Sequence, residues 1–110
     1  MTKPLSKKAK KHLKYILMDI KKSTIKDPVK SKTMELRYGL KGVTIREIVH
    51  YLRAYMNEPI CSDANGCFYP QSKFEANHTI AQLKSRVREI MKVVQGIEGY
   101  FGKESQGSLL

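Results

Sequence analysis

The stretch Gly42-Val-Thr-Ile-Arg-Glu-Ile-Val-His-Tyr-Leu-Arg53 predicts a helix, and Glu58-Pro-Ile-Cys-Ser-Asp-Ala-Asn-Gly-Cys-Phe-Tyr69 predicts a hairpin after it. Thr44 is the expected N-cap, because its hydroxyl can accept a backbone N–H and Glu47 can complete a capping box. In the second stretch, Asn65-Gly66 favours the positive φ angles of a tight turn. We therefore expect a helix that runs into a two-stranded β wing.

The predicted helix has two different faces. At 100° per residue, one face collects the apolar residues Ile45, Ile48, Val49, Leu52 and Met56. Arg46, His50 and Arg53 fall together on another face. Upstream, Ser31 or Thr33 is expected to begin a short helix that ends at Gly42, which leaves a turn of the length found in a helix-turn-helix.

Several residues after the predicted turn carry a resemblance to a known family. They are Leu52-Arg53, Pro59-Ile60-Cys61-Ser62, Gly66 and Phe68-Tyr69, with a long helix after them. This pattern resembles the small winged helix-turn-helix proteins of bacteriophages and other mobile elements, over roughly residues 32–97. The resemblance implies a mainly α fold with a small β-hairpin and a long C-terminal helix. It also implies DNA binding in phage transcription regulation or replication.

The charge of the chain is concentrated in its first part. Of the 110 residues, 41% are hydrophobic and 28% are charged, which is typical of one globular domain. The formal net charge is +11, and residues 1–42 hold 13 Lys or Arg against three acidic residues. Such a field attracts polyanions, either nucleic acid or an anionic membrane surface.

The N-terminal helix is expected over about residues 6–22, after a flexible arm over 1–5. Its apolar residues share one side. Its other sides carry candidate phosphate contacts at Lys7, Lys8, Lys10, Lys11 and Lys14. Two alternatives stay open, a solvated helix face and a surface for a membrane or a target peptide.

The helix-turn-helix, expected over about 31–56, supplies the other candidate DNA contacts. Arg46 can pair with guanine O6 and N7, contact phosphate or remain solvated, and His50 can donate to a base or a phosphate. Arg53 is expected at phosphate. The remaining candidates are Arg37, Lys41 and Ser62, the last of these in the wing over about 59–69. The wing tip lacks Arg and Lys, which weakens the case for a minor-groove contact.

The last helix, expected over about 73–98, has a heptad seam. Ser72 and Glu75 form a capping box at its start. Apolar residues then alternate in steps of four and three at Ala76, Ile80, Leu83, Val87, Ile90, Val94 and Ile97. Either Ile80, Leu83, Val87, Ile90 and Val94 pair with a second copy, or the seam crosses the helix-turn-helix core. Residues 102–110 are expected as a disordered tail.

The sequence offers little support for catalysis or metal binding. Cys61 and Cys67 have five residues between them, more than the usual two to four, and lack the second close pair of a zinc site. The three histidines lie on separate predicted helices, and no Gly-x-Ser-x-Gly elbow occurs. We therefore expect no enzyme activity, cofactor or small-molecule substrate.

The expected compartment is the cytoplasm, and the resemblance to phage proteins implies that of a bacterial host cell. The two cysteines make no disulfide framework, no secretory segment is evident, and no stretch has the apolar length that spans a membrane. We expect one winged helix-turn-helix domain, residues 6–101, that binds double-stranded DNA. If the last helix dimerises, half-sites about one helical turn apart are expected. The alternative is a phage-type protein that inhibits or recruits a host or phage protein.

Overall fold

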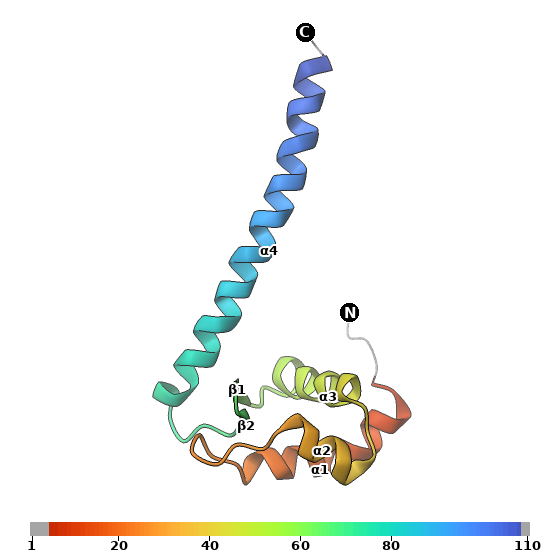
Figure 1. Ribbon diagram of the computed structural model, residues 1–110, viewed down its shortest axis with the longest axis vertical. Helices are drawn as coiled ribbons and strands as arrows, with labels where there is room; N and C mark the ends of the chain where they lie inside the picture. The colour runs from red at the N-terminus through yellow and green to blue at the C-terminus, as the bar shows by residue number, and fades with distance from the viewer. Residues whose placement is uncertain (1–4, 109–110) are drawn as a thin grey trace. The chain divides into compact units, whose positions relative to one another are not determined.

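The computed structural model describes residues 5–108, with side chains through residue 102. Its elements are α1 (Lys7–Lys21), α2 (Ser31–Tyr38), α3 (Gly42–Tyr55), β1 (Cys61–Asp63), β2 (Gly66–Phe68) and α4 (Lys73–Ser108) (Figure 1). The described chain is mainly helical, with an antiparallel hairpin and a long C-terminal helix, as the sequence predicts. It divides between Asn77 and His78 into two compact units.

The start of α1 is defined by Ser6, whose hydroxyl accepts a hydrogen bond from the Ala9 amide at 3.2 Å. Ala9, Ile16 and Ile20 are fully buried along one side of this helix. Leu5 is also buried, at 8% exposure, although we expected it in a flexible arm. Burial of its apolar side chain holds this residue against the core. Residues 1–4, the rest of the predicted arm, lie outside the described residues.

The connection between α2 and α3 differs from the prediction. Gly39, in the left-handed conformation with φ of 63°, ends α2. Gly42 is the first residue of α3, and Lys41 occupies the N-cap position without a side-chain hydrogen bond. The Thr44 amide donates to the Lys41 carbonyl at 3.0 Å, so Thr44 already lies within the first turn. The predicted Thr44 cap is therefore wrong.

The end of α3 is a chain reversal at Asn57. Asn57 adopts a φ of 54°, and the Glu58 amide donates to the Leu52 carbonyl at 3.0 Å. Because the chain reverses here, Met56 is 48% exposed and does not join the core as predicted. The reversal directs the chain into the hairpin.

The core of the first unit lies among α1, α2, α3 and the residue before the hairpin. α1 and α2 both pack against α3. The buried cluster consists of Leu5, Ala9, Ile16, Ile20, Met34, Leu40, Ile45, Ile48, Val49, Leu52 and Ile60. A fully buried aliphatic side chain stabilises a fold by about 1.5–3 kcal/mol. The predicted apolar stripes of α1 and α3 therefore face each other.

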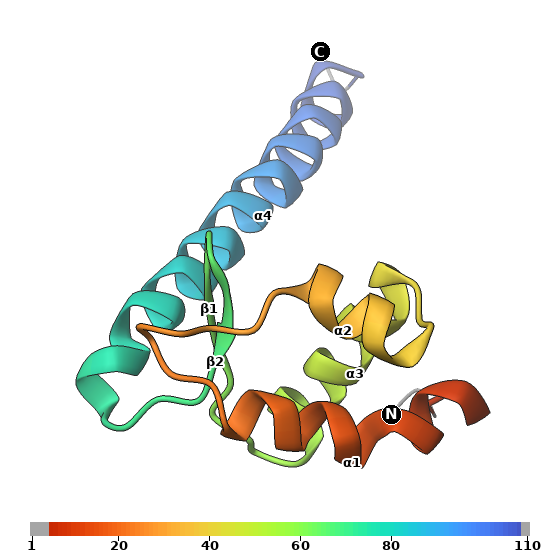
Figure 2. The same cartoon turned by 60° about the horizontal axis from the view of Figure 1, so that its bottom comes forward.

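The hairpin pairs Cys61 with Phe68, Ser62 with Cys67 and Asp63 with Gly66. Gly66 has a φ of 139°, whereas Asn65 has no positive φ, so only one of the two predicted turn residues uses that region. Val29, which precedes α2, forms an isolated antiparallel bridge to Cys67. Figure 2 shows this segment crossing beside the hairpin. The connection from α1 to α2 is thus joined to β2.

α4 begins close to the predicted position and ends later. Ser72 Oγ accepts from the Glu75 amide at 3.4 Å, while Glu75 Oε1 accepts from the Gln71 amide at 3.1 Å. The second contact lies one residue before that of a standard capping box. The helix continues to Ser108, so the predicted tail is helical as far as this residue. Residues 109–110 lie outside the described residues.

Candidate nucleic-acid interface

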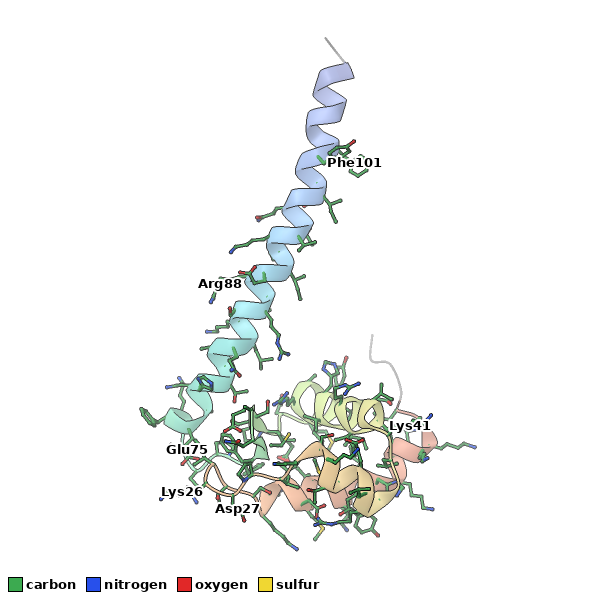
Figure 3. All side chains as sticks on the ribbon, in the orientation of Figure 1. Lys26, Asp27, Lys41, Glu75, Arg88 and Phe101 are labelled. Atoms are coloured by element: carbon green, nitrogen blue, oxygen red, sulfur yellow. The ribbon has the colours of Figure 1, made fainter. Side chains whose placement is uncertain are left out.

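The α2–α3 connection is a short turn. Three residues, Gly39, Leu40 and Lys41, join the two helices. Leu40 is 5% exposed and anchors the turn in the core, and its amide donates to the Glu35 carbonyl at 3.0 Å. Lys41, labelled in Figure 3, is exposed at the start of α3. The turn therefore places a cation beside the N-terminus of a helix, where anions are favoured.

The outer face of α3 carries Val43, Arg46 and His50, all of them exposed. A Cβ on Gly42 would lie 3.4 Å from Glu35 Oε2 and 3.5 Å from Arg46 Nη1, so both side chains approach this glycine. The His50 ring makes an edge contact with Tyr55, with centroids 6.1 Å apart. Arg46 and His50 thus lie where the sequence predicts, on the face opposite the core. Val43, 59% exposed, is an additional surface residue that was not among the candidates.

The guanidinium group of Arg53 donates hydrogen bonds to the hairpin and the residue before it. Its Nε donates to the Ile60 carbonyl at 2.8 Å, and its Nη2 donates to Ser62 Oγ at 3.1 Å. Arg53 and Ser62 were both candidate phosphate contacts, and the structure brings them to each other. Because these donors satisfy partners within the protein, the side chain fixes the hairpin to the end of α3.

Arg37 is also paired within the protein. Its Nη1 lies 2.7 Å from Asp19 Oδ2, and the same carboxylate oxygen accepts from the Tyr38 hydroxyl at 2.7 Å. Hydrogen bonding to Asp19 raises the pKa of Arg37 above its ordinary value. Burial raises the pKa of Tyr38, and its bond to Asp19 adds to this shift. Asp19 therefore ties α1 to α2 and offsets the charge of Arg37.

The predicted lysine face of α1 is exposed throughout. Its members are Lys7, Lys8, Lys10, Lys11 and Lys14. They surround the side of α1 opposite Ala9, Ile16 and Ile20. Because α1 and α3 pack against each other through their buried sides, the lysines lie on the side of α1 away from α3. A straight duplex lying on α3 is therefore not expected to contact all five lysines.

A second group of cations surrounds a polar hollow of about 450 Å³ in the first unit. Lys22, Lys30 and Arg37 contribute to its lining, together with Asp27 and the hydroxyl-bearing Thr33. These residues come from the end of α1, the loop and α2. No local pattern in the sequence indicates this group, because its members are separated by up to 15 positions and meet only in the fold. The hollow has the donors that a phosphate would require.

The hairpin tip carries no basic residue. It consists of Asp63, Ala64, Asn65 and Gly66, and the Asp63 carboxylate accepts from the Asn65 amide at 2.8 Å. A minor-groove contact normally uses Arg or Lys. The tip therefore offers a DNA backbone little electrostatic attraction.

The cysteines contribute to hairpin packing. Cys61 is opposite Phe68 and Cys67 is opposite Ser62, so they are not cross-strand partners. Burial raises the pKa of the Cys67 thiol, and Arg53 opposes this shift. In the described residues, no group of three or more His, Cys, Asp or Glu side chains is arranged to hold a metal ion.

The seam of α4 is exposed along its length. Ile80, Leu83, Val87, Ile90 and Val94, the candidate dimerisation residues, are each between 39% and 61% exposed. From His78 onward the unit contains a single helix. A lone helix cannot bury its own apolar stripe.

No protein-family model, no curated protein and no solved structure matches this chain. Among the described helices, none has the length and apolar character required to cross a bilayer.

Proposed function

We propose that this protein binds double-stranded DNA through a winged helix-turn-helix, with α3 in the major groove. The observation that carries the proposal is the exposure of Arg46 on α3 directly after a three-residue turn from α2. In a helix-turn-helix the second helix presents its outer face to base edges while the first helix braces it. The net charge of +11 supplies the long-range attraction to a polyanion.

The winged form of the motif is supported by the order of the elements. α1 is followed by the strand residue Val29, then by α2 and α3, and then by the β1–β2 hairpin to which Val29 is paired. Arg53 joins the hairpin to α3 through two hydrogen bonds. The wing is thus fixed to the helix that would enter the groove.

Base reading is assigned to the first two turns of α3. Arg46 presents a guanidinium that can donate to guanine O6 and N7, and His50 lies one turn further along. Val43 provides an apolar surface suited to the methyl group of thymine. These three residues make a compact set for direct readout.

Phosphate contacts are assigned to the cations close to α2 and α3. Lys41 lies at the α3 N-terminus, and Lys22 and Lys30 line the polar hollow. The α1 lysines act through the field they create around the protein, which accelerates encounter with DNA. The proposed biological role, regulation or replication in a phage or mobile element within bacterial cytoplasm, rests on the resemblance of residues 52–69 and the following helix.

The test is selection from a randomised duplex library with the wild-type protein, Arg46→Ala and Lys14→Ala. Wild type should enrich a motif, and Arg46→Ala should lose about 1–3 kcal/mol of discrimination at one base pair. Lys14→Ala is the matched control, because it removes an exposed cation from the side of α1 opposite its buried residues and should keep the motif. If Arg46→Ala weakens binding equally on every sequence, Arg46 contacts phosphate. If wild type enriches nothing, the protein is not a sequence-specific DNA binder.

The hairpin tip favours a second candidate function. Asp63 and the absence of Arg or Lys at the tip suit docking onto a protein better than onto DNA. In this case the same fold would inhibit or recruit a host or phage protein. A protein interface with a largely apolar core loses little affinity as salt increases, which distinguishes it from DNA binding.

A further inference from the structure

The apolar seam of α4 is long enough for a coiled coil. From Ile80 to Phe101 it covers about 33 Å of helix at 1.5 Å per residue. In heptad positions, Ile80, Val87, Val94 and Phe101 occupy a, and Leu83, Ile90 and Ile97 occupy d. All seven of these residues are at least 39% exposed. Figure 3 shows Phe101 and Arg88 projecting from different sides of α4, and Arg88 lies outside the seam.

The residues that flank the seam differ along the helix. One flank carries Lys84, Met91 and Glu98, and the other carries Arg86, Val93 and Tyr100. The apolar surface is therefore widest near Met91 and Val93. Charged flanking residues lie before this level, at Lys84 and Arg86, and after it, at Glu98. Among the described residues, the salt bridge within this unit joins Lys92 and Glu89, which lie on the outer side of the helix.

We propose that α4 pairs with α4 of a second copy in an antiparallel coiled coil whose two-fold axis passes at the level of residue 92. In an antiparallel pair, each flank faces the same flank of the partner. Lys84 then meets Glu98 of the second copy, and this pair occurs twice. Met91 meets Met91, and Val93 meets Val93. Opposite charges thus meet at Lys84 and Glu98, and apolar side chains meet at Met91 and at Val93. On the second flank Arg86 meets the ring of Tyr100.

The same register matches the core layers. Val87 of one copy packs at the level of Ile97 of the other, and Val94 packs at the level of Ile90. Leu83 reaches the level of Phe101. At that end of α4, Val93, Gly96, Ile97, Tyr100 and Phe101 surround a shallow apolar groove of about 550 Å³. Leu83 of the second copy thus lies at the level of this apolar groove.

A parallel pair matches these flanks less well. In that arrangement each residue on the second flank faces the first-flank residue five positions later on the partner. Arg86 would then face Met91, and Val93 would face Glu98. Neither is an opposite-charge pair, and both place a charge against an apolar side chain. The flanking charges therefore favour the antiparallel orientation.

The glycines of α4 add a reason for a partner. Gly96, Gly99 and Gly102 all lie within the helix, and glycine lowers the stability of a helix relative to alanine. A helix that contains them is weak in isolation. Burial of Ile97 and Phe101 against a second copy would offset this weakness.

The first test is a charge-reversal series on the full chain, with the dimer dissociation constant measured by sedimentation equilibrium. Lys84→Glu and Glu98→Lys should each raise that constant by roughly tenfold, because each places like charges opposite one another twice. The Lys84→Glu/Glu98→Lys double variant should restore it. A parallel dimer keeps residues 84 and 98 apart, so failure of the double variant to restore dimerisation would overturn the register. A monomer at every concentration would overturn pairing itself.

The second test is cysteine cross-linking of the full chain. Met91→Cys should form an intermolecular disulfide on oxidation, because the two copies of residue 91 face each other in this register alone. Ser85→Cys, on the outer side of the helix, is the matched control and should remain uncross-linked. Equal cross-linking of both variants, or of neither, would contradict the proposal. Neither test involves DNA, so a dimer that binds no duplex would contradict the proposed function and leave this inference standing.

Discussion

Val29 and Cys67 exchange two backbone hydrogen bonds, each 2.8 Å long. This exchange joins the segment before α2 to the strand that leaves the wing, 38 positions later in the chain. Cys67 also pairs with Ser62 across the hairpin, so β2 lies between two partners. The arrangement fixes the outer edge of β2 to the segment between α1 and α2. Together with Arg53, it holds the wing from two sides.

Gly66→Ala should destabilise the protein strongly. Gly66 has a φ of 139°, and a Cβ there would lie 2.5 Å from the Val29 carbonyl oxygen. Strain of this kind costs about 1–3 kcal/mol, and the contact adds to it. Urea unfolding should therefore show a lower free energy of unfolding. Gly99→Ala is the control, since a Cβ there meets nothing within 4 Å and alanine favours a helix. Equal stability of the two variants would contradict the close approach of Val29.

Arg53→Ala should lower stability where Arg46→Ala does not. Removal of Arg53 leaves the Ile60 carbonyl without its side-chain donor, a change that typically costs about 1–3 kcal/mol. Arg46 is exposed, and its loss should change the free energy of unfolding by less than about 0.5 kcal/mol. Thermal or urea unfolding of both variants measures the difference. If Arg53→Ala is as stable as wild type, the arginine does not support the wing.

Stability should fall as pH rises beyond the ordinary pKa of tyrosine, near 10. Burial raises the pKa of Tyr38 and of Tyr69, and bonds to Asp19 and Glu58 add to the respective shifts. Both hydroxyls therefore lose their protons more readily in the unfolded chain, which favours unfolding at high pH. Urea unfolding on both sides of pH 10 should show this loss. A Tyr38→Phe/Tyr69→Phe variant should lose less stability over the same interval, and an unchanged pH dependence would contradict the assignment.

Lys10→Ala/Lys14→Ala should slow DNA association and leave sequence preference unchanged. Both lysines are exposed on α1, on the side away from the core shared with α3. In the proposed function their charges act on encounter, whereas α3 is the element that reads the bases. Stopped-flow association with a selected duplex and a repeated library selection would measure the two effects. A changed motif would contradict this prediction and indicate that α1 contacts the bases.

The regular periodicities of the sequence predicted the helices well. The stripe of Ala9, Ile16 and Ile20 and the seam of α4 follow from spacing alone, because helical geometry repeats locally. The turn between α2 and α3 was harder to predict from the sequence. Two glycines, Gly39 and Gly42, lie close together, and burial of Leu40 between them places the helix end at the first. The periodicity of the apolar residues does not indicate which glycine ends the helix.

Contacts over long sequence separations explain the other differences. Arg37 and Asp19 are 18 positions apart, and Arg53 meets acceptors beyond the Asn57 reversal. Each arginine was a candidate DNA contact because an isolated cation on a helix suggests an external partner. In the fold, both have internal partners. Arg46, Lys41 and His50 remain the candidates on the face next to the turn.

Binding to DNA can be measured directly as the equilibrium affinity of the full chain for a duplex at salt concentrations from about 50 to about 200 mM. If the protein docks on DNA through about five phosphates, the logarithm of the association constant should fall with the logarithm of salt with a slope of about −4 to −5. Binding that is independent of salt, or no binding at the lowest salt, would contradict DNA as the partner.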